Sequence, residues 1–157
     1  MLNFPVVGGT SGHFLGAVFA AILLGPWMSC LTMAMVLFVQ CLIFQDGGLT
    51  ALGANIFNMG IIGGILGYYI YFGLKYLIKG EVGTFTATFL AAWASVVLAS
   101  AACAIELAIS GTSPLYVALP AMVSIHALIG IGEGLITTVA IALVHKTRPD
   151  LLALEKV

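Results

Sequence analysis

Long apolar runs fill nearly the whole chain, and polar residues gather in the short connections between them. A run of about 20 apolar residues is long enough to cross the hydrocarbon core of a bilayer. Pro26 interrupts the first run, and proline inside a helix removes a hydrogen bond and clashes with the preceding turn. The pattern therefore predicts five apolar helices, the first of them short, over residues 12–24, 27–44, 54–74, 84–109 and 117–144.

These segments predict an all-α integral membrane protein, a bundle of about five transmembrane helices. We expect residues 1–157 to form one membrane domain, with a polar tail at 145–157. Hydrophobic residues make up 62% of the chain and charged residues 7%. A soluble domain carries about 25% charged residues, so this chain has too little polar surface for a water-facing globule.

The few charges predict how the chain is oriented in the membrane. Basic residues flank the connection after the third segment and follow the fifth segment, at Lys75, Lys79, Lys146, Arg148 and Lys156. The long connections 45–53 and 110–116 carry no Lys or Arg. The positive-inside rule then places the C-terminus in the cytoplasm and the loop 8–13 on the outer face. A net charge of −1 without a basic patch gives no indication of a nucleic-acid partner.

Glycines recur at helix-packing spacing, at Gly60, Gly63, Gly64 and Gly67 and again at Gly130 and Gly134. Small residues allow helix backbones to approach closely in lipid. Packing within the bundle is the favoured interpretation, and a docking face for a partner subunit is the alternative. The three cysteines lie inside apolar runs without CxxC spacing, so we interpret them as helix-packing residues.

Three ionisable residues at membrane depth, Glu106, His126 and Glu133, are candidates for an intramembrane polar network. Glu106 lies near the outer end of its segment, where its carboxylate can reach the surface. His126 and Glu133 lie seven residues apart, which corresponds to about 10 Å of helix rise, so they cannot touch. We expect each to hydrogen-bond to a neighbouring helix, or else to lie on an ion path.

His13 lies in the Gly/Ser-rich loop GGTSGH on the predicted outer face. Neutral imidazole binds cobalt, nickel, copper and zinc. A lone histidine is weak evidence by itself, and the sequence places no second His or Cys near it.

Several separate motifs resemble the CbiM/NikM family, the substrate-binding membrane components of energy-coupling factor transporters for cobalt and nickel. They are GGTSGHFLGAVFAAILLGPW, QDGGLTALGANIFNMG, HALIGIGEGLITT and the terminal RPDLL, in this order along the chain. Members usually begin with Met-His-Ile-Pro and two further helices before the histidine loop. This chain begins with Met1-Leu2-Asn3, so it resembles a truncated seven-helix protein.

The resemblance implies a multi-pass protein of the cytoplasmic membrane that captures Co²⁺ or Ni²⁺ outside the cell, with cobalamin biosynthesis as one use of the cobalt. Its partners would be a transmembrane coupling subunit, a small accessory membrane subunit and cytoplasmic ATPase subunits. ATP hydrolysis would belong to those subunits, so the chain itself would not be an enzyme and would need no cofactor. His13 occupies the position of a family metal ligand, with Asn55, Thr10 and Ser11 as supporting residues.

Other functions remain open at this point. A capture subunit for an organic vitamin would need an enclosed pocket with several aromatic and polar contacts and would not depend on His13. A structural membrane subunit would use the glycine faces to bind a partner and would carry no ligand. An intramembrane enzyme using His126 and Glu133 would need a nucleophile or a metal within reach, and the sequence contains neither HExxH nor GxSxG.

Overall fold

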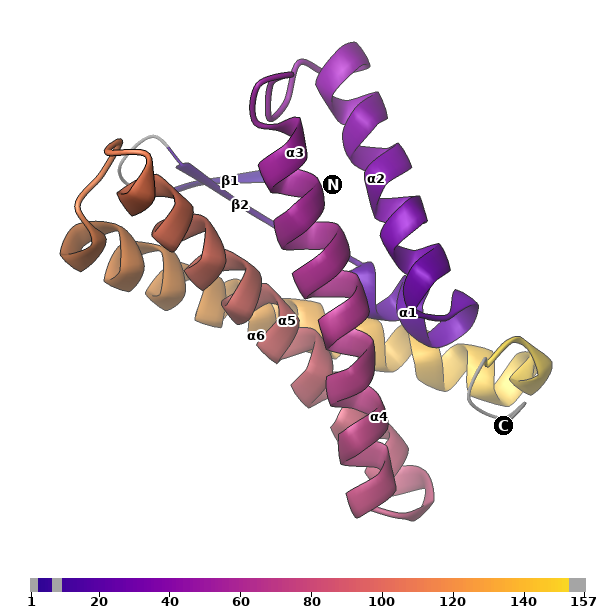
Figure 1. Cartoon of the computed structure of the whole chain (residues 1–157). Helices are drawn as coiled ribbons and strands as arrows, with labels where there is room; N and C mark the ends of the chain where they lie inside the picture. The colour runs from indigo at the N-terminus through magenta and orange to yellow at the C-terminus, as the bar shows by residue number, and fades with distance from the viewer. Residues whose placement is uncertain (1–2, 7–9, 153–157) are drawn as a thin grey trace.

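The structure, a computed structural model, describes residues 3–6 and 10–152, with side chains from residue 12 onward (Figure 1). The elements are β1 (Asn3–Val6), β2 (Thr10–His13), α1 (Ala17–Leu24), α2 (Pro26–Ile43), α3 (Leu52–Asn55), η1 (Ile56–Leu66), α4 (Gly67–Leu77), α5 (Gly80–Ile109), α6 (Leu115–Thr147) and η2 (Pro149–Leu151). α3, η1 and α4 follow one another without a break and form one long helix, whose middle has π-helical geometry.

Within the described residues, four helices are long and apolar enough to cross a membrane: α2, the helix from Leu52 to Leu77, α5 and α6. This confirms the predicted helical membrane bundle. The short first helix, α1, has eight residues and rises about 12 Å, which is less than the thickness of the hydrocarbon core.

The N-terminal region differs from the prediction, because β1 and β2 form an antiparallel hairpin where a loop was expected. Asn3 pairs with His13 and Val6 pairs with Thr10. A predicted helix from residue 12 is therefore wrong at its start, since residue 13 still belongs to the hairpin and α1 begins at Ala17. Helices α5 and α6 also extend beyond their predicted bounds, and residues 145–147 of the predicted tail are helical.

The break after α1 lies where the sequence predicted it. Gly25 has φ of +87°, which glycine adopts without steric cost, and Pro26 occupies the first turn of α2, where its missing N–H is not needed. The hydroxyl of Ser29 then donates a hydrogen bond of 2.8 Å to the carbonyl of Ala17, which ties α2 to α1. Helix α1 is thereby held as a buried short helix.

The glycines pack helices of this chain against one another. A Cβ on Gly64 would lie 2.9 Å from Ser29 Oγ, and one on Gly134 would lie 2.7 Å from the ring of Phe89. Gly67 approaches Val18 in the same way, at 2.7 Å. These contacts confirm the interpretation of the glycines as packing positions within the bundle.

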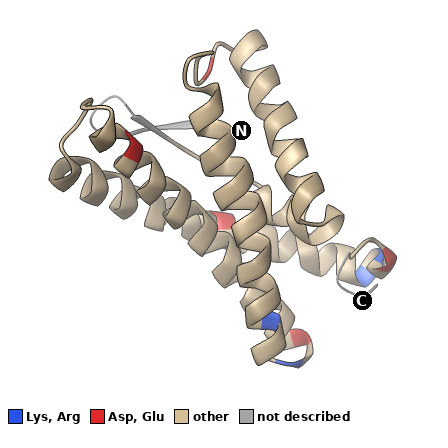
Figure 2. Ribbon diagram, in the orientation of Figure 1, with Lys and Arg blue, Asp and Glu red and all other residues tan. Residues whose placement is uncertain are grey.

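Charged residues lie mainly at the ends of the helices (Figure 2). The basic residues shown cluster at the turn between α4 and α5 and near the C-terminus, whereas the loop between α2 and α3 carries an acidic residue. This distribution agrees with the charge pattern used to orient the chain, and the orientation itself stays a prediction.

Candidate functional site

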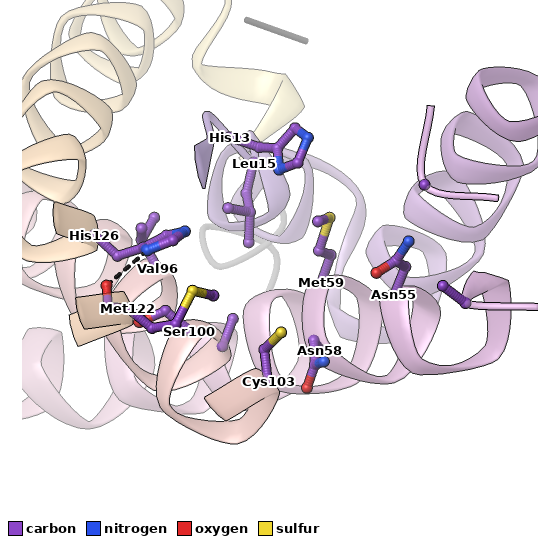
Figure 3. A pocket seen from close by; sticks show the side chains of 13 residues that line it. His13, Leu15, Asn55, Asn58, Met59, Val96, Ser100, Cys103, Met122 and His126 are labelled. Carbon is purple, nitrogen blue, oxygen red and sulfur yellow. Dashed lines mark hydrogen bonds between the residues drawn. The ribbon is translucent and has the colours of Figure 1, made fainter. Parts of the chain in front are cut away.

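A cavity of about 260 Å³ opens where the end of the hairpin, the loop after α2, the helix α3–η1, α5 and α6 meet (Figure 3). Its lining combines two imidazoles, two amides and three sulfur-bearing side chains with small and aliphatic residues. The lining residues are His13, Leu15, Gly47, Ala51, Asn55, Asn58, Met59, Val96, Ala99, Ser100, Cys103, Met122 and His126. The cavity therefore collects residues that lie more than 100 positions apart in the sequence.

His13 reaches the cavity from the last position of β2. Its side chain is 13% exposed, and its Nε2 lies 3.7 Å from Oδ2 of Asp46. Burial lowers the pKa of His13 below the ordinary 6.5, and the negative charge of Asp46 opposes this shift without cancelling it. The neutral imidazole that a metal requires is therefore favoured, beside a carboxylate that attracts cations.

Asp46 was not predicted as a site residue, although it is the charged residue of the glycine-rich connection. Its loop turns through two glycines with positive φ, and Gly47 has φ of +86°. A Cβ on Gly47 would lie 2.7 Å from Nδ2 of Asn55. Asn55 thus packs directly against the loop that carries Asp46, a position from which it can support the His13–Asp46 pair.

His126 lines the cavity from α6 and is 6% exposed. Its Nδ1 lies 2.7 Å from the carbonyl oxygen of Met122. Because a carbonyl only accepts hydrogen bonds, Nδ1 carries the proton and Nε2 keeps its lone pair. The expected bond to a neighbouring helix is wrong for Nδ1, which bonds within α6. This backbone bond sets the tautomer that histidine ligands of metals commonly use.

Asn58 links η1 to α5 beside the same cavity. Its Nδ2 donates a hydrogen bond of 2.7 Å to Oε2 of Glu106, while its buried Oδ1 has no hydrogen-bond partner among the described residues. Glu106 is partly buried, and this bond joins it to a neighbouring helix. The sequence signal for Asn58 was its spacing of three residues after Asn55 on one helix.

Glu133 lies away from His126 and outside the lining of this cavity. Its carboxylate accepts hydrogen bonds from the backbone N–H groups of Leu15 and Gly16, at 3.0 and 2.6 Å. The partner is therefore the segment before α1, not a neighbouring helix as expected. Glu106, His126 and Glu133 have separate partners and do not form one connected network through these bonds.

Among the described residues, no group of three His, Cys, Asp or Glu side chains could hold a metal ion. The sulfur atoms of Met59, Cys103 and Met122 line the cavity and were not predicted, because single Met and Cys residues in apolar runs resemble core residues. The side chains of Thr10 and Ser11 lie outside the described part of the structure. The cavity thus presents separate nitrogen, oxygen and sulfur donors, and Asp46 lies next to its His13 without lining the cavity.

The family model described as the cobalt uptake substrate-specific transmembrane region matches residues 1–151. This chain belongs to the CbiM family. The match covers nearly the whole chain, so the resemblance carried by the separate motifs is confirmed.

Related proteins agree with this family assignment. The putative fused nickel transport protein NikMN of Archaeoglobus fulgidus is 44% identical over 97% of this chain and 50% of its own length. The cobalt transport protein CbiM of Geobacter sulfurreducens is 35% identical over 97% of this chain and 45% of its own length. This CbiM-family chain thus spans about half the length of these relatives.

A solved structure supports the fold. The crystal structure of a truncated transition metal transporter superposes with a TM-score of 0.86 and 34% sequence identity, covering 93% of this chain and 73% of that chain. At this similarity the CbiM-family chain shares its fold with that transporter. The family and the apolar helices together establish a multi-pass membrane protein.

Proposed function

We propose that this CbiM-family chain is the substrate-binding part of a transporter for Co²⁺ or Ni²⁺. The observation that carries the proposal is the cavity that presents the partly buried His13 imidazole beside Asp46, with His126 on the same cavity. Imidazole nitrogen suits both ions, and the adjacent carboxylate favours a cation. Relatives named as nickel and cobalt transport proteins support the same substrate class.

His13 is the proposed metal ligand. Asn55 supports it by packing against the loop of Asp46, and Thr10 and Ser11 precede it in β2. His126 presents Nε2 to the cavity and is a second nitrogen donor, while Asn58 Oδ1 can accept a hydrogen bond from a water bound to the ion. Relatives named as transport proteins support transport as the proposed role.

In this proposal residues 1–157 form one domain of the cytoplasmic membrane, with the C-terminus in the cytoplasm. The basic ends of α4 and α6 support that orientation. The proposed partners are a transmembrane coupling subunit, a small accessory membrane subunit and ATPases that hydrolyse ATP outside this chain. Lipid of the bilayer would surround the exposed apolar side chains.

The test is Co²⁺ binding and uptake by wild-type protein and by His13→Ala. We expect His13→Ala to abolish uptake and weaken Co²⁺ binding while membrane insertion stays intact, because the variant loses its imidazole ligand. His145→Ala is the matched control, since His145 lies at the far end of α6 against Phe85. Unchanged uptake by His13→Ala would remove the site assignment.

The cavity argues against capture of an organic vitamin. Pockets for drug-sized ligands measure about 300–1,000 Å³, and this cavity measures about 260 Å³. Its volume suits an ion with part of its hydration shell better. An organic ligand that competes with Co²⁺ in the binding assay would favour the vitamin alternative.

A further inference from the structure

Glu133 accepts hydrogen bonds from the backbone that follows the proposed metal ligand, His13. One carboxylate oxygen accepts the N–H of Leu15 at 3.0 Å and the other accepts the N–H of Gly16 at 2.6 Å. The two residues lie 118 and 117 positions away in the sequence. Both contacts are made two or three residues after His13, so the carboxylate fixes the chain at the point where it leaves β2 and enters α1.

Both oxygens of the Glu133 carboxyl group take part in this contact. The side chain is 4% exposed, and each of its oxygens accepts one backbone N–H. Helix α1 begins immediately after Gly16 and has no side-chain cap. A carboxylate at its start satisfies free N–H groups and interacts favourably with the positive end of the helix dipole.

The same short segment is also held by close packing on both sides. A Cβ on Gly132 would lie 3.0 Å from the ring of Phe14, and a Cβ on Gly63 would lie 2.9 Å from the side chain of Leu15. Phe14 therefore packs against α6 beside Glu133, and Leu15 packs against η1. These contacts leave the backbone between His13 and Gly16 little freedom to move.

Helix α6 is itself anchored to α5 around this point. A Cβ on Gly130 would lie 3.0 Å from the side chain of Trp93, whose Nε1 donates a hydrogen bond of 3.0 Å to the carbonyl of Ala127. A Cβ on Gly134, one turn further on, would lie 2.7 Å from the ring of Phe89. Glu133 thus connects the His13 segment to the packed pair of helices α5 and α6.

We propose that Glu133 is the positioning residue of the metal site, acting through the backbone of Leu15 and Gly16 to hold the His13 imidazole in the cavity. The proposal rests on the proposed function, because it assigns to Glu133 an effect on the metal bound by His13. Glu133 lies outside the lining of the cavity. It lines a second hollow with Phe14, Leu15 and Gly16 instead.

The first measurement compares Co²⁺ binding to purified wild-type protein and to Glu133→Gln in lipid nanodiscs. Glutamine is similar in size, but its single oxygen can accept only one of the two N–H groups, and its NH₂ faces the other. We expect Co²⁺ affinity to fall about 10- to 100-fold, the range found when residues that orient metal ligands are changed. The d–d absorption spectrum of bound Co²⁺ should also change, because the position of the imidazole changes the coordination geometry.

Two further variants separate positioning from general stability. Glu133→Asp keeps the charge and both oxygens, so it should restore part of the affinity lost in Glu133→Gln. Thr137→Val removes a buried hydroxyl one turn further along α6 and should leave the affinity and the spectrum unchanged. The proposal is overturned if Glu133→Gln binds Co²⁺ with wild-type affinity and spectrum.

The second measurement is backbone hydrogen exchange in metal-free protein. Peptides containing Leu15 and Gly16 should exchange about 10-fold faster in Glu133→Gln than in wild type, because a buried hydrogen bond is lost. Unchanged exchange would overturn the proposal that Glu133 holds the backbone of Leu15 and Gly16. If wild-type protein fails to bind Co²⁺, the proposed function fails, and the exchange rates alone still decide whether Glu133 holds the segment.

Discussion

Replacing Gly64 with alanine tests how closely the bundle is packed. The Cβ added at Gly64 would lie 2.9 Å from Ser29 Oγ and 3.6 Å from the backbone nitrogen of Cys30. Ser29 cannot move freely, because it is fully buried and its hydroxyl donates a hydrogen bond of 2.8 Å to the carbonyl of Ala17. The new methyl group must therefore separate two helices or break that bond.

The matched control is Gly73→Ala on the same continuous helix, where an added Cβ meets nothing within 4 Å. Both substitutions gain the higher helix propensity of alanine, about 0.5–1 kcal/mol. Subtracting the change in unfolding free energy of Gly73→Ala from that of Gly64→Ala cancels this gain. The remainder is the cost of overpacking at Gly64, about 1–3 kcal/mol. We expect Gly73→Ala to be neutral or slightly stabilising and Gly64→Ala to lower the free energy of unfolding by that difference.

The assay is reversible unfolding in mixed micelles, followed by helical circular dichroism. A double-mutant cycle with Ser29→Ala identifies the contact, since removing the hydroxyl makes room for the new methyl group. Gly64→Ala should then cost less in the Ser29→Ala background than in wild type. Equal stabilities of Gly64→Ala and Gly73→Ala, or no coupling between Gly64 and Ser29, would refute the packing argument.

Two other substitutions test single interactions. Trp93→Phe removes the hydrogen bond from Nε1 to the carbonyl of Ala127 between α5 and α6; the same unfolding assay should show a loss of about 1 kcal/mol, and no loss would mean that packing alone joins these helices. Asp46→Asn removes the negative charge 3.7 Å from His13 Nε2, so Co²⁺ titration should show weaker binding, whereas Glu81→Gln at an exposed helix end should not. Equal affinities of the two variants would show that the Asp46 charge does not contribute.

The sequence by itself determined the spans and the break between α1 and α2. The bilayer thickness sets the length of an apolar helix, so the long runs identified α2, α5 and α6 and the helix from Leu52 to Leu77 with small errors at their ends. Pro26 after a glycine marked the start of α2 for a steric reason that needs no tertiary information. The family resemblance likewise identified His13 as a candidate ligand, and this assignment stays a prediction.

Sequence did not determine the hairpin. The strand β1 is four residues long, which is too short for an alternation of apolar and polar residues to identify it. In the structure β1 pairs with β2 as far as His13, whereas the sequence predicted a helix from residue 12. The correct start of α1 depended on the pairing of two strands and on the contact with Glu133.

Only the tertiary structure decided which polar groups meet. Asp46 lies beside His13, Asn58 bonds Glu106, and Glu133 bonds the segment before α1. In a water-soluble helix the apolar face reveals which side points inward. Here the faces toward lipid and toward other helices are both apolar, so the rotation of each helix, and with it every long-range polar contact, follows from packing between helices and not from the hydrophobic pattern.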